Sequence, residues 1–353
     1  MITLEKDGLK LVLTRPGTYY QGTRFDRAGV FRSVEKEGRI YADEWFRAYD
    51  PLMHDAVCGP SEEFGVAEFE NEDGGFSDSF DLAEADCAEW AEARGRFLKP
   101  GVGWLRRPDA GSLPGLGSHP EPEPYDRFRL YEVADEGVRS LEVLPDAVIF
   151  GQKLDVYNYL KTIRLTGHDS FEITHHFENL GTHALRFTHY NHNFFTLESA
   201  SVGPAREIDF PFKPCGHWRS EYDNVRLTDG GIRFSGAVPP EGPSVFMGDL
   251  KAAGRLVEPR ESMVEPRGSV EDGHFSAGRD KPRRREGQAG MAEPIDFTVR
   301  DRESGIGVHV SCPLPFTHMV FWSNDRVACV EPYLLLTVGA RDSLEWTLNY
   351  RLL

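Results

Sequence analysis

The sequence predicts an all-β protein built as one large antiparallel β-sandwich. Apolar and polar residues alternate through most of the 353 residues, helical periodicity is rare, and 35 glycines and 23 prolines supply many turns. A hydrophobic content of 40%, with 12% aromatic residues, is enough for a packed core. The closing segment Ser343–Leu353 shows the pattern most clearly, because its apolar residues share one face and its polar residues the other.

The expected strands are the segments with a period of two residues. In chain order they are Leu9–Leu13, Gly29–Val34, Gly137–Leu144, Asp155–Leu165, Phe171–Phe177, Leu185–Leu197, Phe297–Arg300, Gly307–Ser311, Thr317–Trp322 and Ser343–Leu353. The N-terminal residues also alternate, as an edge strand does. An Asn-Leu-Gly turn signal follows the strand that ends at Phe177, so this strand and the next one are expected to be antiparallel neighbours.

Three segments depart from this pattern. Asp81–Glu92 is an acidic, alanine-rich helix candidate, and Pro108–Pro124 is a glycine- and proline-rich loop. Lys251–Pro294 is the most polar part of the chain and is expected to be a loop excursion between strands. Residues 1–353 are therefore expected to form a single domain with an excursion at about 251–294.

Charge and composition narrow the class of partner. A formal net charge of -17 disfavours binding to a phosphate backbone, which needs positive charge, and the basic run Asp280–Gly287 is expected to be a solvated loop. The five cysteines are an odd number without CxxC spacing, which suggests a reducing compartment. The first residues do not show the basic segment and following apolar run of a leader, so none is expected, and the sequence contains no run of about 20 apolar residues. We expect a soluble, cytoplasmic protein with no nucleic-acid or membrane partner.

The stretch Thr188–Leu197, with the sequence THYNHNFFTL, contains the first candidate functional residue. In a regular strand Tyr190, His192 and Phe194 share one face. Such a histidine is either an acid that faces a ligand or a core residue. His189 projects to the opposite face, so it cannot chelate a metal together with His192, and no metal site is expected.

The segment Cys329–Tyr333, with the sequence CVEPY, contains the second candidate functional residue, Glu331. Glu331 stands between Val330 and Pro332, and a carboxylate in such apolar surroundings is seldom without a role.

Together, NHNFF and a distant CVEPY resemble the motifs of the galactose mutarotase-like (aldose 1-epimerase) superfamily. The resemblance places the catalytic histidine at His192 and the catalytic glutamate at Glu331. It implies a β-supersandwich with an open groove, and interconversion of the α and β anomers of a free sugar without a cofactor. Ring opening needs a base at the anomeric hydroxyl and an acid at the ring oxygen, roles that fit Glu331 and His192 respectively. The pKa values of Glu331 and His192 must lie near neutrality for the reaction to run in both directions, so partial burial of Glu331 is expected.

Five further residues are candidate sugar contacts, and each has a structural alternative. Arg24 stands where the family often contacts a sugar hydroxyl, or it pairs with Asp26 at the surface. His54 stands where the family places a second histidine, although the usual His-Gly pattern is absent. Glu62 could bind substrate or lie in a solvated turn. Trp104 and Trp322 could stack on a pyranose ring or belong to the core.

Two other functions remain open on the same scaffold. The protein could bind carbohydrate without catalysis. It could also be a glycoside hydrolase or lyase, with Glu62 or Glu63 facing Glu331 at roughly 5–10 Å. The particular sugar and the oligomeric state are not indicated. The negative charge and the lack of a glycine-rich phosphate loop argue against a phosphate-bearing sugar. A local cluster of arginines could override this argument.

Overall fold

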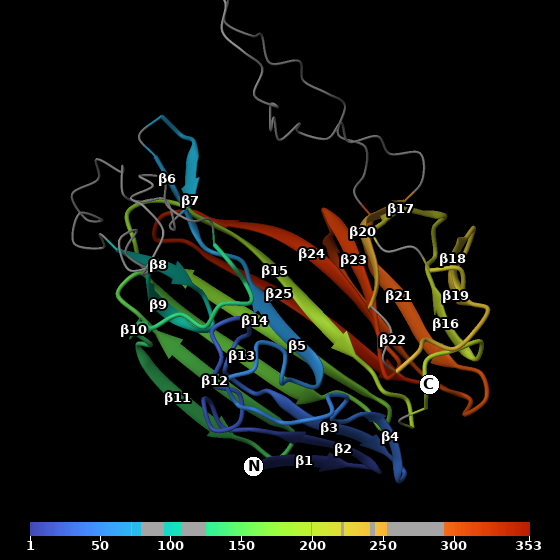
Figure 1. Ribbon diagram of the computed structural model, residues 1–353. Coiled ribbons are helices and arrows are strands. Elements are labelled where there is room, and N and C mark those ends of the chain that lie inside the picture. The colour runs from blue at the N-terminus through green and yellow to red at the C-terminus, as the bar shows by residue number, and fades with distance from the viewer. Residues whose placement is uncertain are drawn as a thin grey trace, which may run out of the picture.

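The structure is a computed structural model. It describes residues 1–71, 73–78, 95–107, 125–198, 200–219, 222–240, 244–252 and 293–353. In these ranges the regular elements are all β-strands and none is a helix, which confirms the predicted fold class (Figure 1). The helix candidate Asp81–Glu92 and the loop Pro108–Pro124 lie outside the described residues, as does most of the 251–294 excursion.

The larger of the two main sheets has ten antiparallel strands. In spatial order they are β11 (Val138–Val143), β12 (Ala147–Lys153), β13 (Tyr157–Leu165), β14 (Ser170–Asn179), β25 (Ser343–Leu352), β22 (Ile306–Pro315), β21 (Pro294–Asp301), β16 (Arg206–Asp209), β19 (Gly231–Phe234) and β18 (Val225–Thr228).

The other main sheet has eight strands. They are β17 (Pro214–Trp218), β20 (Val245–Ala252), β23 (His318–Ser323), β24 (Ala328–Val338), β15 (Leu185–Phe194), β6 (Glu68–Glu70) and β7 (Phe76–Asp78), with β5 (Gly59–Phe64) paired to β15 beside this path.

Two small sheets complete the described fold. A four-stranded sheet contains β1 (Ile2–Lys6), β2 (Leu9–Leu13), β3 (Phe31–Lys36) and β4 (Arg39–Ala42). A three-stranded sheet contains β8 (Arg96–Lys99), β9 (Gly103–Arg106) and β10 (Val133–Asp135). As expected from its alternation, β1 lies at an edge of its sheet.

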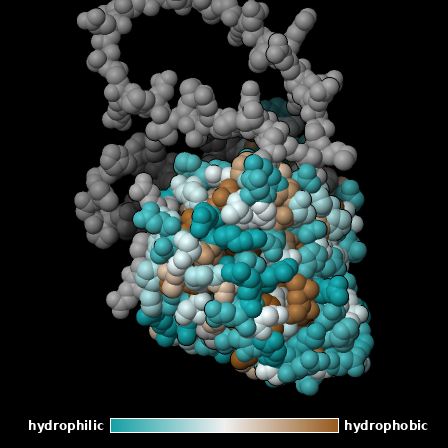
Figure 2. All heavy atoms as spheres, turned by 90° about the vertical axis from the view of Figure 1, so that its right-hand side faces the viewer, coloured by the Kyte–Doolittle hydropathy of each residue, from teal (hydrophilic) through white to brown (hydrophobic). Residues whose placement is uncertain are grey.

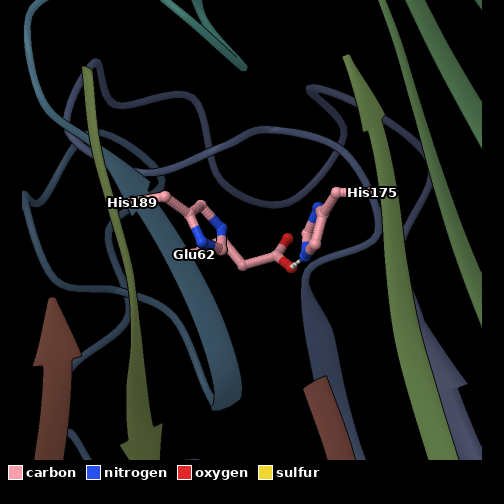
Figure 3. Close-up of side chains that lie close together, drawn as sticks. All are labelled: Glu62, His175 and His189. Carbon is pink, nitrogen blue, oxygen red and sulfur yellow. Dashed lines mark ion pairs between the residues drawn. The ribbon is translucent and has the colours of Figure 1, made fainter. Parts of the chain in front are cut away.

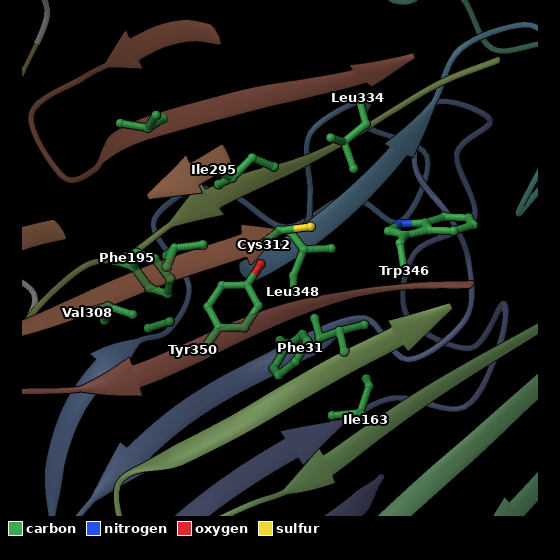
Figure 4. Packing of buried hydrophobic residues seen from close by; sticks show 14 of the residues in the cluster. Phe31, Ile163, Phe195, Ile295, Val308, Cys312, Leu334, Trp346, Leu348 and Tyr350 are labelled. Carbon is green, nitrogen blue, oxygen red and sulfur yellow. The ribbon is translucent and has the colours of Figure 1, made fainter. Parts of the chain in front are cut away.

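One hydrophobic core joins side chains of both main sheets. Trp346, Leu348 and Tyr350 of β25 are buried in it, and Leu334 of β24 contributes from the eight-stranded sheet (Figure 4). Burying a large apolar side chain is worth about 1.5–3 kcal/mol, so these alternating positions account for much of the stability of the sandwich. The buried face of β25 is the face that the sequence alternation predicts.

The predicted pairing of the two strands around the Asn-Leu-Gly turn is wrong. β14 pairs with β13 and β25, whereas β15 pairs with β5, β6 and β24 in the other sheet. The turn carries the chain from one sheet to the other. His175 of β14 and His189 of β15 consequently meet between the sheets, with ring centroids 4.7 Å apart.

Two strands that position the candidate site lack sequence alternation. All six residues of β5 are buried, and β24 is buried continuously from Ala328 to Leu334. A strand buried on both faces has no reason to alternate between apolar and polar residues, so the period-two pattern does not detect it. The expectation of a solvated turn in this region is therefore wrong for Gly59–Phe64.

The remaining sequence expectations concern the surface and the cysteines. The face formed by the ends of β16, β18 and β19 is mostly hydrophilic, with hydrophobic residues in small separate patches (Figure 2). The four cysteines in the described ranges, Cys58, Cys215, Cys312 and Cys329, are free. Among the described residues there is no helix with the length and apolar character needed to cross a membrane.

Candidate active site

The candidate site lies on the face of the eight-stranded sheet that points away from the inter-sheet core. β15 runs between β5 and β24, and its Tyr190, His192 and Phe194 project to this face. The aromatic rings hold the imidazole from both sides, with centroids 5.1 Å from Tyr190 and 5.4 Å from Phe194. His189, as expected, points into the core instead.

Both nitrogens of the His192 ring face carboxylates. Nδ1 lies 2.8 Å from Glu331 Oε1, and Nε2 lies 3.0 Å from Glu63 Oε2. His192 is 2% exposed and Glu331 is 5% exposed, so the expected burial of Glu331 is confirmed. Each ring nitrogen thus has a carboxylate oxygen within hydrogen-bond distance.

Glu63 is buried but surrounded by positive charge. Arg24 donates from Nε to Glu63 Oε2 over 2.7 Å, and Lys99 Nζ lies 3.8 Å from Oε1. Burial opposes ionisation of Glu63, but Arg24, His192 and Lys99 outweigh it and hold the pKa of Glu63 well below its usual range. Glu63 is therefore a permanent anion behind His192.

The Cys329 thiol supports the other carboxylate. It lies on β24 and donates to Glu331 Oε1 over 3.7 Å. Burial, with a contribution from Glu331, raises the pKa of Cys329 well above its usual range. The sulfur therefore stays protonated and acts as a hydrogen-bond donor.

His192 and Glu331 stand on the wall of a cavity of about 330 Å³. This volume falls in the range of small-molecule sites, which are mostly apolar with a few placed polar groups. The cavity fits that description, since its wall consists of Trp45, Phe128, Phe194, Phe246, Val320, Trp322 and Tyr333 with the polar residues Arg24, His54, Asp55, Arg127, His192, Ser244 and Glu331.

Three of the five candidate sugar contacts are on this wall. Arg24, His54 and Trp322 line the cavity together with His192 and Glu331. His54 has its Nε2 3.4 Å from Asp55 Oδ2, and its ring meets Phe128 edge to face. Arg24 pairs with Glu63 and not with Asp26, the partner that the sequence alternative suggested.

The other two candidates, Glu62 and Trp104, are core residues and not cavity residues. Glu62 follows the strand periodicity to the face opposite Glu63, where it pairs with Lys161 and His175. Trp104 is buried, stacks on Phe69 and donates to Asp155 Oδ1. For Glu62, one strand position decides between the two faces of β5.

Glu62, His175 and His189 form a buried cluster whose ligand atoms lie within 4.8 Å of one another (Figure 3). The spacing suits a metal ion, but the chemistry of the donors does not. Lys161 already neutralises Glu62, and the indole of Trp346 donates to His189 Nδ1 over 3.2 Å. Burial, followed by the effect of His175, lowers the pKa of His189 well below its usual range, so its single proton must stand on Nε2. A protonated nitrogen has no lone pair for a metal.

Arg127 is not among the residues predicted from the sequence, and Glu63 is predicted there only as a second carboxylate for hydrolysis, not as a partner of His192. Both charges lie in segments without strand alternation, and the partners of Glu63 come from positions as distant as Arg24 and His192. The available signal was the Glu-Glu pair in a chain segment otherwise free of Lys and Arg, because neighbouring strand residues must take opposite faces.

Comparison with known proteins gives a likeness of fold. No family model and no curated protein matches the chain. Among solved structures, the Slr1438 protein of Synechocystis is 13% identical, with a TM-score of 0.50 over 99% of this chain and 94% of that one. A galactose mutarotase-like protein of Lactobacillus casei is 11% identical with a TM-score of 0.48, covering 100% of both chains. A candidate aldose 1-epimerase of Escherichia coli K12 is 12% identical with a TM-score of 0.47, covering 99% and 98%.

At such identities, the match to the Slr1438 protein shows a shared fold and nothing of activity. Aldose 1-epimerase and galactose mutarotase-like proteins are among the solved structures that this chain is similar to, as the two motifs predicted.

Proposed function

We propose that the protein is a mutarotase that interconverts the α and β anomers of a free sugar. The observation that carries this proposal is the pair formed by His192 and Glu331, 2.8 Å apart on the wall of a cavity with several aromatic side chains. In a cyclic sugar, the hydroxyl that must lose a proton and the ring oxygen that must gain one are bonded to the same carbon. An acid and a base side by side suit this arrangement.

In this mechanism Glu331 removes the proton from the anomeric hydroxyl and His192 Nδ1 gives its proton to the ring oxygen. The bond between the anomeric carbon and the ring oxygen breaks, and the open chain carries an aldehyde or ketone. After rotation about the adjacent carbon–carbon bond, the hydroxyl that formed from the ring oxygen attacks the other face of the carbonyl. The proton then returns to Nδ1, and Glu331 returns its own to the new anomeric hydroxyl.

Glu63 determines which of the two nitrogens of His192 gives up its proton. Because Glu63 is anionic and lies 3.0 Å from Nε2, the proton on Nε2 remains there when His192 reacts. The proton that leaves is therefore the one on Nδ1, which faces Glu331 and the cavity. The neutral ring then presents a free lone pair at Nδ1 for the return step.

The direct test is saturation-transfer NMR of anomer exchange with a panel of aldoses, ketoses and acidic sugars. The proposal expects faster exchange for at least one sugar in the presence of the protein, compared with the same sample after heat denaturation. A folded protein that binds a sugar but accelerates no exchange would instead be a carbohydrate-binding protein. Hydrolysis is less suited to the site, because the His192 ring stands between Glu63 and Glu331 where a glycosidic bond would need open space.

Glu63→Gln is expected to lower kcat by about 10- to 100-fold, as the loss of a positioning partner of a histidine does. KM should change much less than kcat, because Glu63 is not among the residues on the cavity wall. Rate measurements over a range of sugar concentrations test both effects, with Glu35→Gln as control, since Glu35 pairs with Lys10 on a different sheet. An unchanged kcat would show that Glu63 serves only the packing of Arg24.

A further inference from the structure

We propose that the substrate is an acidic sugar, whose carboxylate or phosphate lies away from the anomeric carbon and is bound by Arg127. This rests on the proposed function for the position of the anomeric carbon at His192 and Glu331. It adds a substrate class that the acid–base pair alone does not indicate, and it reverses the sequence argument against anionic sugars.

Arg127 is a cation placed for a ligand. It is exposed, and it lines both the main cavity and an adjoining hollow of about 210 Å³. Its guanidinium hydrogen-bonds to Tyr333, whose side chain also belongs to both walls. Within the described residues no carboxylate lies in ion-pair contact with Arg127, so most of its N–H donors are available to a bound molecule.

The carboxylate of Glu63, whose charge acts on Arg127, already has other partners. Glu63 is shared by Arg24, Lys99 and His192 and cannot also neutralise Arg127. The crowding of positive charge is visible at Lys99, where burial, with the help of Arg24 and Arg127, lowers the pKa to about 8 despite the opposing effect of Glu63. Around Glu63, the three cations Arg24, Lys99 and Arg127 thus outnumber the one carboxylate, inside a protein whose formal net charge is -17.

The position of Arg127 indicates which end of the sugar is charged. Its partner Tyr333 lies two residues beyond Glu331 on the same face of β24, a separation of about 7 Å along the strand. That separation suits a single pyranose ring with its anomeric carbon at Glu331 and an acidic substituent at Arg127. A guanidinium matches carboxylate or phosphate with two parallel hydrogen bonds, which a neutral hydroxymethyl group cannot accept.

Binding measured by isothermal titration calorimetry at low salt tests this inference independently of catalysis. The ligands are glucose, glucuronate and glucose 6-phosphate, which separate a neutral sugar, a carboxylate and a phosphate. We expect one of the acidic sugars to bind wild type at least about 10-fold more tightly than glucose does. Arg127→Gln should weaken that acidic sugar by about 10- to 100-fold and change glucose affinity by less than about threefold.

Arg226→Gln provides the matched control, because Arg226 is an exposed arginine on β18 of the other main sheet. It should leave all three affinities unchanged. Equal affinity of wild type for all three sugars, no binding of any of them, or an acidic sugar that binds Arg127→Gln as well as wild type would each overturn the inference. Arg127-dependent binding without faster anomer exchange would reject the proposed function alone. Faster exchange of glucose without preference for an acidic sugar would reject the acidic substrate alone.

Discussion

Glu331→Gln is expected to slow protein-catalysed anomer exchange by about 10²- to 10⁴-fold, the usual contribution of a general base. The amide preserves the shape of the side chain and can still accept from His192 Nδ1 or from the Cys329 thiol. It cannot take the proton of the anomeric hydroxyl. Saturation-transfer NMR on the best sugar of the panel measures the loss, and far-ultraviolet circular dichroism checks that the variant is folded.

The double variant Glu331→Gln/His192→Asn sharpens this prediction. If the two residues act as one acid–base unit, the double variant should be about as slow as either single variant, because the effects of such residues are not additive. Glu345→Gln, which removes an exposed carboxylate from β25, should exchange anomers at the wild-type rate. If Glu331→Gln exchanged anomers at the wild-type rate, the proposed mechanism would be wrong even though the fold is that of mutarotase-like proteins.

The sequence pattern predicts the strands that have one solvent-exposed face, but it does not detect β5 and β24, which are buried on both faces. β25 and β15 follow from alternation because solvent on one side imposes polar residues at every second position of β25 and of the first half of β15. β5 and β24 are covered on both faces, and β5 even includes two adjacent glutamates. In the sequence, the pair Glu62 and Glu63 is typical of a solvated turn, because the positively charged residues that pair with it lie far away in the chain.

The same limit applies to the site. The motifs NHNFF and CVEPY indicate His192 and Glu331, and the structure brings these two residues together. Of the two glutamates of β5, Glu62 is the predicted sugar contact, whereas in the structure Glu63 lies beside His192 and Glu62 beside His175 in the core. Which glutamate faces the cavity depends on the register of β5 against β15, where Glu63 lies opposite Tyr190 and Glu62 opposite Asn191. Register is set by pairing between distant segments, so a single sequence does not state it.

Glu62→Gln is expected to destabilise the fold by about 3–5 kcal/mol, the cost of removing one member of a buried ion-paired group. Glu62 neutralises Lys161 and lies 3.0 Å from His175 Nε2, while Lys161 also pairs with Asp26 Oδ2 over 2.9 Å. The variant leaves a buried ammonium with one carboxylate in place of two. Urea denaturation at pH 7 measures the change, with Glu172→Gln as control. Glu172 faces Arg164 at the partly exposed surface, where an ion pair contributes at most about 1 kcal/mol.

The pH dependence of stability separates an electrostatic role of Glu62 from simple packing. Burial opposes its ionisation, but Lys161 and His175 prevail and hold the pKa of Glu62 well below its usual range. A carboxyl group whose pKa is lower in the folded state stabilises the fold fully above its unfolded pKa of about 4.3, and this contribution is lost as the pH falls toward the folded value. Wild type should therefore lose more stability between pH 6 and pH 3 than Glu62→Gln does. Parallel stability curves for the two proteins over that interval would mean that Glu62 stabilises the sandwich through shape and not through charge.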